Sequence, residues 1–248
     1  NSKAKTSIIK ILCADDMIIS NKLENIYLFM KKNKSCKLMT CYDQNIKNRL
    51  LTDMKTLTES FSNIGNKYYI KFTPQSSMIA FFAFGNVCGN LSRVTYRKVK
   101  DGKNPAFDQK YPYAGDYNAW VRFSQKYGFY LVKKNYVYVR KHSNQASNFL
   151  NLKNELYPQF PKIYNFLLKN IKKKHHAYLR KYMLINNLPQ RIRRYINCLI
   201  SGEIKLANKV FANLPLKISI LECFLNAFFF KFRNNLLNKL NKYYRNYI

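Results

Sequence analysis

Near its start the sequence has a short apolar segment that ends in two adjacent aspartates, and this pattern limits both the fold and the function expected of the chain. Residues 6–14 are apolar and rich in β-branched side chains, with Lys10 as the interruption, a pattern that predicts a buried strand. Asp15 and Asp16 follow at once. The whole chain has only 12 acidic residues against 44 Lys and Arg, so this pair stands out from the composition. We expect a functional role for it, with capping of the next helix as the alternative.

The residues that follow alternate between helical and strand patterns. Residues 21–32 carry apolar side chains at helical spacing behind a cap at Ser20 or Asn21, and a helix over 116–127 is expected to stop at Gly128. Further strand patterns fall at residues 37–42, 94–97 and 129–140. This alternation predicts an α/β domain. Beyond about residue 147 the pattern becomes helical and prolines interrupt it repeatedly.

Two more polar motifs lie downstream of the aspartate pair. The first, AGDYNAWVR at residues 114–122, places Asp116 one helical turn before Trp120, the only tryptophan of the chain. The second, VRKHSNQAS at residues 139–147, carries Arg140 and His142 at the end of the last strand pattern. The simpler interpretations are that Asp116 caps its helix and that His142 fills space in the core or on the surface.

Taken in this order, the three segments resemble family 2 glycosyltransferases of the GT-A fold. Those enzymes carry an Asp-Asp metal and nucleotide element, an acidic-Asp-Tyr-x-x-Trp catalytic element and a later Arg-x-His element. The resemblance spans roughly residues 6–147. It implies an inverting transfer of a sugar from a nucleotide-sugar donor to a cell-surface glycan or lipid-linked acceptor. The expected fold is a partial GT-A, Rossmann-like α/β domain over residues 1–150, followed by a basic α-helical C-terminal region over 151–248.

The resemblance also assigns a role to each motif residue. Asp15 would face the nucleotide ribose or phosphate, and Asp16 would bind the Mg²⁺ or Mn²⁺ ion that stabilises the departing diphosphate. Asp116 would be the general base, because the acceptor hydroxyl must lose its proton as it attacks the anomeric carbon. Arg140 and His142 would close over the diphosphate, with His142 as a phosphate contact or a metal ligand.

The sequence departs from the family pattern in three places. Cys13 stands where many members carry another acid, and Gly115 stands where a glutamate often precedes the catalytic aspartate. A complete enzyme also begins with an apolar strand, a Pro-Thr-Tyr-like turn and an early aspartate that reads the base, and none of these precedes Thr6. We therefore expect a truncated chain that has weak or no activity by itself.

Residues 85–90, which include two glycines, would border the acceptor.

The net charge of +32 and a pI near 10 indicate an anionic partner, and the first alternative is therefore a basic nucleic-acid-binding protein. No recognisable module appears and the aromatic residues fall at core spacing, so no nucleic-acid partner is expected. A second alternative, independent of the charge, is a degenerate glycosyltransferase that serves only as a scaffold. Part of the charge reflects a composition rich in Lys, Asn and Ile, typical of AT-rich coding sequence.

The cysteine pattern and the hydropathy predict a cytoplasmic protein, peripheral to the inner face of the cell membrane. The six cysteines form no Cys-x-x-Cys pair, so we expect reduced, buried thiols. No apolar run approaches the ~20 residues that a membrane span requires. Residues 218–232 are nevertheless very aromatic, and they predict either a helix lying in an anionic membrane surface or an ordinary helix packed on the α/β domain.

Overall fold

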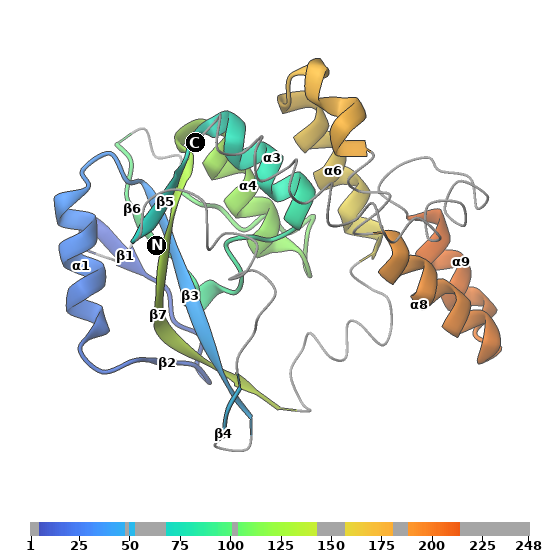
Figure 1. Cartoon of the computed structure of the whole chain (residues 1–248), viewed down its shortest axis with the longest axis horizontal. Coiled ribbons are helices and arrows are strands. Elements are labelled where there is room, and N and C mark those ends of the chain that lie inside the picture. The colour runs from blue at the N-terminus through green and yellow to red at the C-terminus, as the bar shows by residue number, and fades with distance from the viewer. Residues whose placement is uncertain are drawn as a thin grey trace.

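Helices cover both faces of a mixed β-sheet in the computed structural model of the chain (Figure 1). The structure describes residues 5–47, 50–52, 68–100, 104–142, 157–180 and 188–213. The strands are β1 (Ile8–Lys10), β2 (Met17–Ile18), β3 (Leu38–Lys47), β4 (Leu50–Thr52), β5 (Tyr69–Phe72), β6 (Thr95–Arg97) and β7 (Phe129–Lys141). The α-helices are α1 (Lys22–Lys32), α3 (Pro74–Phe84), α4 (Gly115–Tyr127), α6 (Phe160–Asn170), α8 (Leu188–Ile200) and α9 (Ile204–Ala212).

The two long strands β3 and β7 form the centre of the sheet. They pair in parallel from Met39 opposite Tyr130 to Lys47 opposite Lys141, with irregular register around Tyr42. The main strand order is β1-β6-β3-β7-β2, while β4 pairs with β3 and β5 pairs with β7. Every other pairing in the described part of the sheet is antiparallel. The sheet is therefore mixed, with one parallel pair at its centre.

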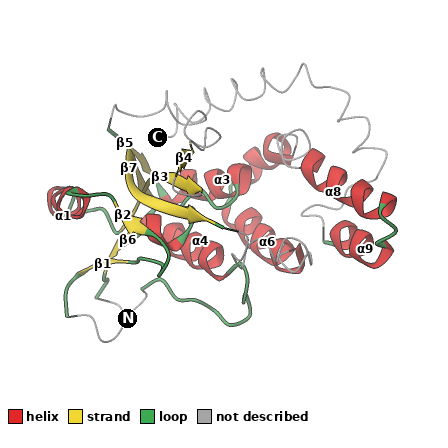
Figure 2. Cartoon of the chain, turned by 90° about the horizontal axis from the view of Figure 1, so that it is seen from below, coloured by secondary structure: helices red, strands yellow, loops and turns green. Residues whose placement is uncertain are grey.

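Alternating side chains of the central strands feed two separate cores. Leu38 of β3 and Phe129 of β7 point into the larger core, which α3, α4 and α6 complete, whereas Met39 and Tyr130 point into the smaller core under α1. Figure 2 shows α1 on one side of the sheet and α3, α4 and α6 on the opposite side. Because the side chains of a strand alternate between faces, β3 and β7 must be apolar on both sides to sit between two helical layers.

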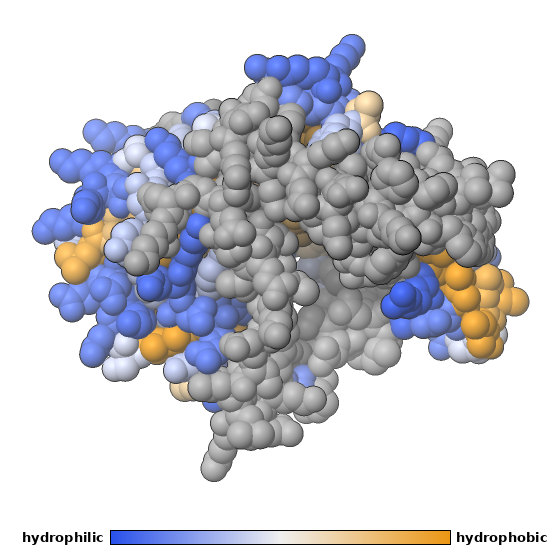
Figure 3. All heavy atoms as spheres, in the orientation of Figure 1, coloured by the Kyte–Doolittle hydropathy of each residue, from blue (hydrophilic) through white to orange (hydrophobic). Residues whose placement is uncertain are grey.

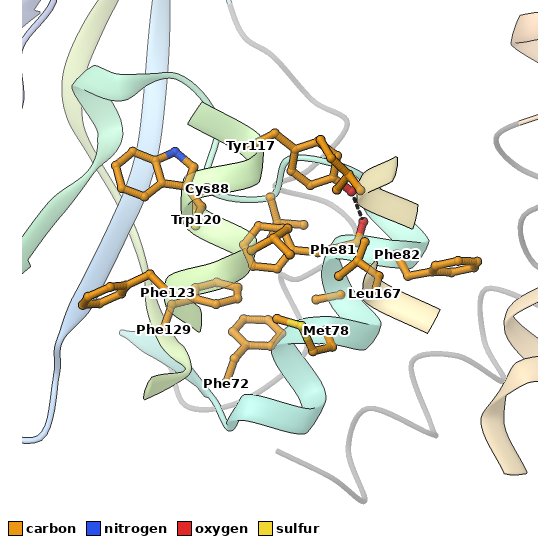
Figure 4. Packing of buried hydrophobic residues seen from close by; sticks show 14 of the residues in the cluster. Phe72, Met78, Phe81, Phe82, Cys88, Tyr117, Trp120, Phe123, Phe129 and Leu167 are labelled. Carbon is orange, nitrogen blue, oxygen red and sulfur yellow. Dashed lines mark hydrogen bonds between the residues drawn. The ribbon is translucent and has the colours of Figure 1, made fainter. Parts of the chain in front are cut away.

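Aromatic rings fill the larger core, as Figure 4 shows. The rings of Phe72 and Phe129 stack with their centroids 4.3 Å apart, and Trp120 of α4 is fully buried. The Tyr117 hydroxyl donates a hydrogen bond of 2.7 Å to the Phe81 carbonyl, which joins α4 to α3 (Figure 4). The buried phenol thus keeps its hydrogen bond while its ring contributes to the core.

The elements that the sequence predicts most clearly are confirmed, and one strand is not. α1, α4 and β7 lie where their patterns placed them, and α4 ends at Gly128. The prediction of a buried strand over residues 6–14 is wrong. β1 is only three residues long and is partly exposed, and among the described strands it pairs with β6 alone, in the antiparallel sense. An end strand with one neighbour cannot be buried as a central parallel strand would be.

The C-terminal helices begin by packing on the α/β layers. α6 places Ile163, Tyr164 and Leu167 in the larger core, against α3 and α4. The expected helical character is confirmed for the described residues beyond 157, whereas the predicted domain boundary near 148–154 and the segment 218–232 lie outside them. None of the helices described is long and apolar enough to cross a membrane.

Replacement of Gly128 by alanine should destabilise the fold strongly. Its φ is +65°, and a Cβ there would lie 2.1 Å from the Phe72 carbonyl oxygen, where β5 passes the end of α4. We expect Gly128→Ala to lower the free energy of unfolding, measured in urea, by at least about 3 kcal/mol, because steric overlap adds to the backbone strain. Gly202→Ala is the matched control, with a φ of +73° and open space, and it should lose only about 1 kcal/mol. Equal losses would show that the contact with Phe72 does not matter.

Candidate functional site

Residues 85–93, which connect α3 to β6, join two of the three sequence motifs. We call them the bridging segment. The Asn90 side-chain amide donates a hydrogen bond of 3.1 Å to Oδ2 of Asp16. The Asn86 amide donates one of 3.0 Å to Oδ2 of Asp116. One short segment therefore supports two carboxylates that lie far apart in the sequence.

Asp16 is buried, and it also reaches the third motif. Its Oδ1 accepts a hydrogen bond of 3.1 Å from the backbone N–H of Arg140, near the end of β7. With Asn90 on its other oxygen, Asp16 ties three parts of the chain together. A carboxylate oxygen has two lone pairs, so each oxygen of Asp16 retains accepting capacity.

Asp15 and His142 form an accessible pair beside this anchor. Nε2 of His142 and Oδ2 of Asp15 are 3.0 Å apart, and the two side chains are 39% and 42% exposed. This hydrogen bond is the main reason why the pKa of Asp15 lies below its ordinary value, and the charge of Arg140 acts in the same direction. The aspartate pair thus divides into a buried carboxylate that accepts two hydrogen bonds and an exposed one that faces a histidine.

Asp116 lies in the first turn of α4 and is not its N-cap, which is Ala114. Its Oδ1 accepts a hydrogen bond of 2.6 Å from the Tyr117 N–H. Burial raises the pKa of Asp116 above its ordinary value, while the hydrogen bonds from Tyr117 and Asn86 oppose that shift. A raised pKa makes a carboxylate a stronger proton acceptor, as a general base requires.

A buried arginine holds the bridging segment against the sheet. The Nε of Arg93 donates a hydrogen bond of 2.6 Å to the Cys41 carbonyl of β3, and its Nη1 lies 3.3 Å from Oδ1 of Asp43. Gly89 packs directly on this guanidinium, because a Cβ at that position would lie 2.4 Å from Nη1 of Arg93. A glycine suits this position for two reasons: its φ is +69°, in the left-handed region, and the buried Arg93 side chain leaves no room for a Cβ without shifting.

The loop that carries the aspartate pair is fastened to the same segment. The Ser92 hydroxyl accepts a hydrogen bond of 2.8 Å from the backbone N–H of Cys13. The Lys10 ammonium donates to the carbonyls of Ser92 and Val94, and burial lowers the pKa of Lys10. The backbone of Cys13 thus helps to place Asp15 and Asp16.

The capacity of the site for a metal ion depends on Asp15 and His142. Within the part of the chain that the structure describes, no group of three or more His, Cys, Asp or Glu side chains is arranged to hold an ion. Asp15 and His142 offer one oxygen and one nitrogen next to each other. Mg²⁺ commonly takes only one or two carboxylates from a protein and completes its shell with phosphate oxygens and water.

The structure therefore brings Asp15, Asp16, Arg140 and His142 together and links Asp116 to them through the bridging segment. An open cavity of about 480 Å³ lies elsewhere, along α4 near Arg122 and Lys126, and none of these five residues lines it. Sequence reasoning missed the partners Asn86, Asn90 and Arg93. The two glycines of the segment were the available signal.

Comparisons with known proteins do not identify the chain. No protein-family model matches it, and no curated protein shows significant similarity to it. The roles of the five motif residues stay predictions.

The raised pKa of Asp116 should make the stability of the protein depend on pH. At pH values between the unfolded-state and the folded-state pKa of Asp116, the folded state binds more protons at this carboxyl than the unfolded state does. The contribution of Asp116 to the free energy of unfolding therefore increases as the pH falls, and it is lost as the pH rises through the folded-state pKa. Wild type should therefore gain stability relative to Asp116→Asn between pH 7 and pH 4, as measured by urea unfolding. Asp108→Asn, in a loop, is the control. A pH-independent difference between wild type and Asp116→Asn would contradict the assignment.

Proposed function

We propose that this protein is a glycosyltransferase that moves a sugar from a nucleotide-sugar donor to a hydroxyl of a glycan or lipid-linked acceptor, with inversion at the anomeric carbon. The observation that carries the proposal is the shared support of Asp16 and Asp116 by Asn90 and Asn86 of one segment. An inverting transfer needs a donor-side and an acceptor-side group in fixed relation to each other. The α/β fold is compatible with this function.

The donor side consists of Asp15, Asp16, Arg140 and His142. The accessible Asp15–His142 pair, with a lone pair of Asp16, would hold a Mg²⁺ or Mn²⁺ ion that takes its other ligands from the diphosphate and water. Such an ion would stabilise the negative charge on the departing diphosphate. The cationic side chain of Arg140, exposed near the end of β7, would bind the same phosphates.

The acceptor side consists of Asp116 and its partners. As the acceptor oxygen forms its bond to the anomeric carbon, Asp116 takes the hydroxyl proton and the bond to the diphosphate oxygen breaks. The raised pKa of Asp116 favours this transfer. The hydrogen bonds from Asn86 and the Tyr117 N–H hold both carboxylate oxygens in place while they receive the proton.

Binding and hydrolysis of sugar nucleotides test the proposal. A panel of nucleoside diphosphate sugars is offered to this chain with and without Mn²⁺. We expect donor binding that depends on the cation, together with slow hydrolysis of the bound donor. Absence of donor binding would overturn the proposal, and tight salt-sensitive binding of nucleic acid in its place would favour the alternative function.

Replacement of Asp16 should abolish most of the metal-dependent hydrolysis of the donor. Asp16→Asn removes a carboxylate charge from the donor side and turns one oxygen into an N–H donor that faces Asn90 or the Arg140 N–H. We expect a loss of turnover of about 10²-fold or more. Asp108→Asn, which removes a carboxylate outside the site, is the matched control. Near-normal, metal-dependent turnover by Asp16→Asn would refute its role.

Replacement of Asp116 should separate binding from transfer. Asp116→Asn preserves the size of the side chain and removes the proton acceptor, so acceptor glycosylation should fall by roughly 10²- to 10⁴-fold while donor binding is retained. Donor affinity by calorimetry and transfer by product analysis provide the two readouts. If both fall to the same extent, Asp116 serves folding and not proton transfer.

A further inference from the structure

Three large apolar side chains are exposed together where α8 turns into α9. Leu199, Ile200 and Ile204 are 42%, 80% and 62% exposed, and we call them the apolar tip. Figure 3 shows a hydrophobic patch at this end of the molecule, next to a hydrophilic one. Exposing apolar groups to water is unfavourable in free energy, so three of them at one turn make it a candidate contact surface.

The fold of the helical pair does not itself require these side chains. Cys198, Ala207 and Val210 are buried and form the inner face of the two helices. The turn is closed by backbone hydrogen bonds, from the Gly202 N–H to the Leu199 carbonyl at 3.1 Å and from the Glu203 N–H to the Cys198 carbonyl at 2.8 Å. The apolar tip is therefore additional to the internal packing of α8 and α9.

Exposed cationic side chains lie on the two helices that carry the apolar tip. Arg193 of α8 and Lys205 of α9 are exposed, and Glu203 is the only acidic residue between 157 and 213. A second copy of this chain would bring the same cations against one another at a net charge of +32, which disfavours self-association. A nucleic acid would match the cations but would leave the isoleucines in water. An anionic bilayer satisfies both kinds of side chain.

We propose that the α8–α9 turn is a membrane-docking surface for anionic phospholipids. Leu199, Ile200 and Ile204 enter the boundary between headgroups and acyl chains, and Arg193 and Lys205 contact lipid phosphates. This surface is distinct from residues 218–232, and the proposal stands whether or not the protein transfers sugars.

Vesicle co-sedimentation of the full chain tests the apolar part of the proposal. Vesicles of phosphatidylglycerol with phosphatidylcholine are compared with vesicles of phosphatidylcholine alone, at low and high salt. We expect binding to the anionic vesicles that weakens as salt rises. Ile200→Ser with Ile204→Ser should weaken it on the order of tenfold. The matched control is Leu23→Ser with Leu28→Ser on α1, where the two leucines are 54% and 49% exposed, and it should leave binding unchanged.

A second pair of variants tests the cationic part. Arg193→Gln with Lys205→Gln and Lys31→Gln with Lys32→Gln, the second pair being exposed on α1, remove the same charge. Only the first pair should weaken binding, on the order of tenfold. Equal weakening by both pairs would show diffuse attraction, and unchanged binding of the isoleucine variant would place the contact elsewhere; either result overturns the proposal. So would an absence of vesicle binding, or wild-type self-association without vesicles that the isoleucine variant abolishes.

Discussion

The candidate site depends on the contacts that the buried guanidinium of Arg93 makes with the sheet. A charge out of contact with water is tolerated only when it is paired and hydrogen-bonded, and Arg93 meets this requirement with Asp43 and the Cys41 carbonyl. These contacts attach the bridging segment to β3, at the centre of the sheet. Through Asn86 and Asn90 the segment then places the two carboxylates of the site.

The acidic residues show how unevenly this basic chain uses its few carboxylates. Four of the five aspartates in the described part of the chain, Asp15, Asp16, Asp43 and Asp116, belong to this network. Each of the four has a defined partner: a histidine for Asp15, backbone and amide N–H groups for Asp16 and Asp116, and an arginine for Asp43. Only Glu24, Asp108 and Glu203 are acidic among the other described residues, so the remaining surface is strongly cationic, which suits the proposed anionic membrane partner.

The sequence predicts those parts of the fold that local rules determine. The helix that ends at Gly128 and the strand after it follow from side-chain spacing and from the conformational freedom of glycine. A cap at Asn21 was correct in position, yet this residue makes no side-chain cap hydrogen bond. β1 was predicted too long, since apolar composition does not reveal whether a strand lies at the end or the centre of a sheet.

The site could be predicted only as a set of residues and not as a network. The motifs pointed to Asp16 and Asp116, but the amides that hold them come from residues whose type is common in turns. Nor does the sequence tell which member of the Asp15–Asp16 pair is buried, because both follow the same strand. Tertiary contacts with Arg140 and His142 make that distinction.

Hydrogen exchange in a variant without the Arg93 guanidinium shows whether this side chain holds the candidate site together. Arg93→Met is combined with Asp43→Asn so that no unpaired buried charge remains, and Asp43→Asn alone is the control. Two backbone amides report on the site: that of Gly89, which donates to the Asn86 carbonyl, and that of Arg140, which donates to Asp16. We predict that the protection of both amides against exchange falls on the order of tenfold or more, while amides at the centre of the paired β3 and β7 keep their protection. If Gly89 and Arg140 stay as protected as in the control, Arg93 does not hold the site together.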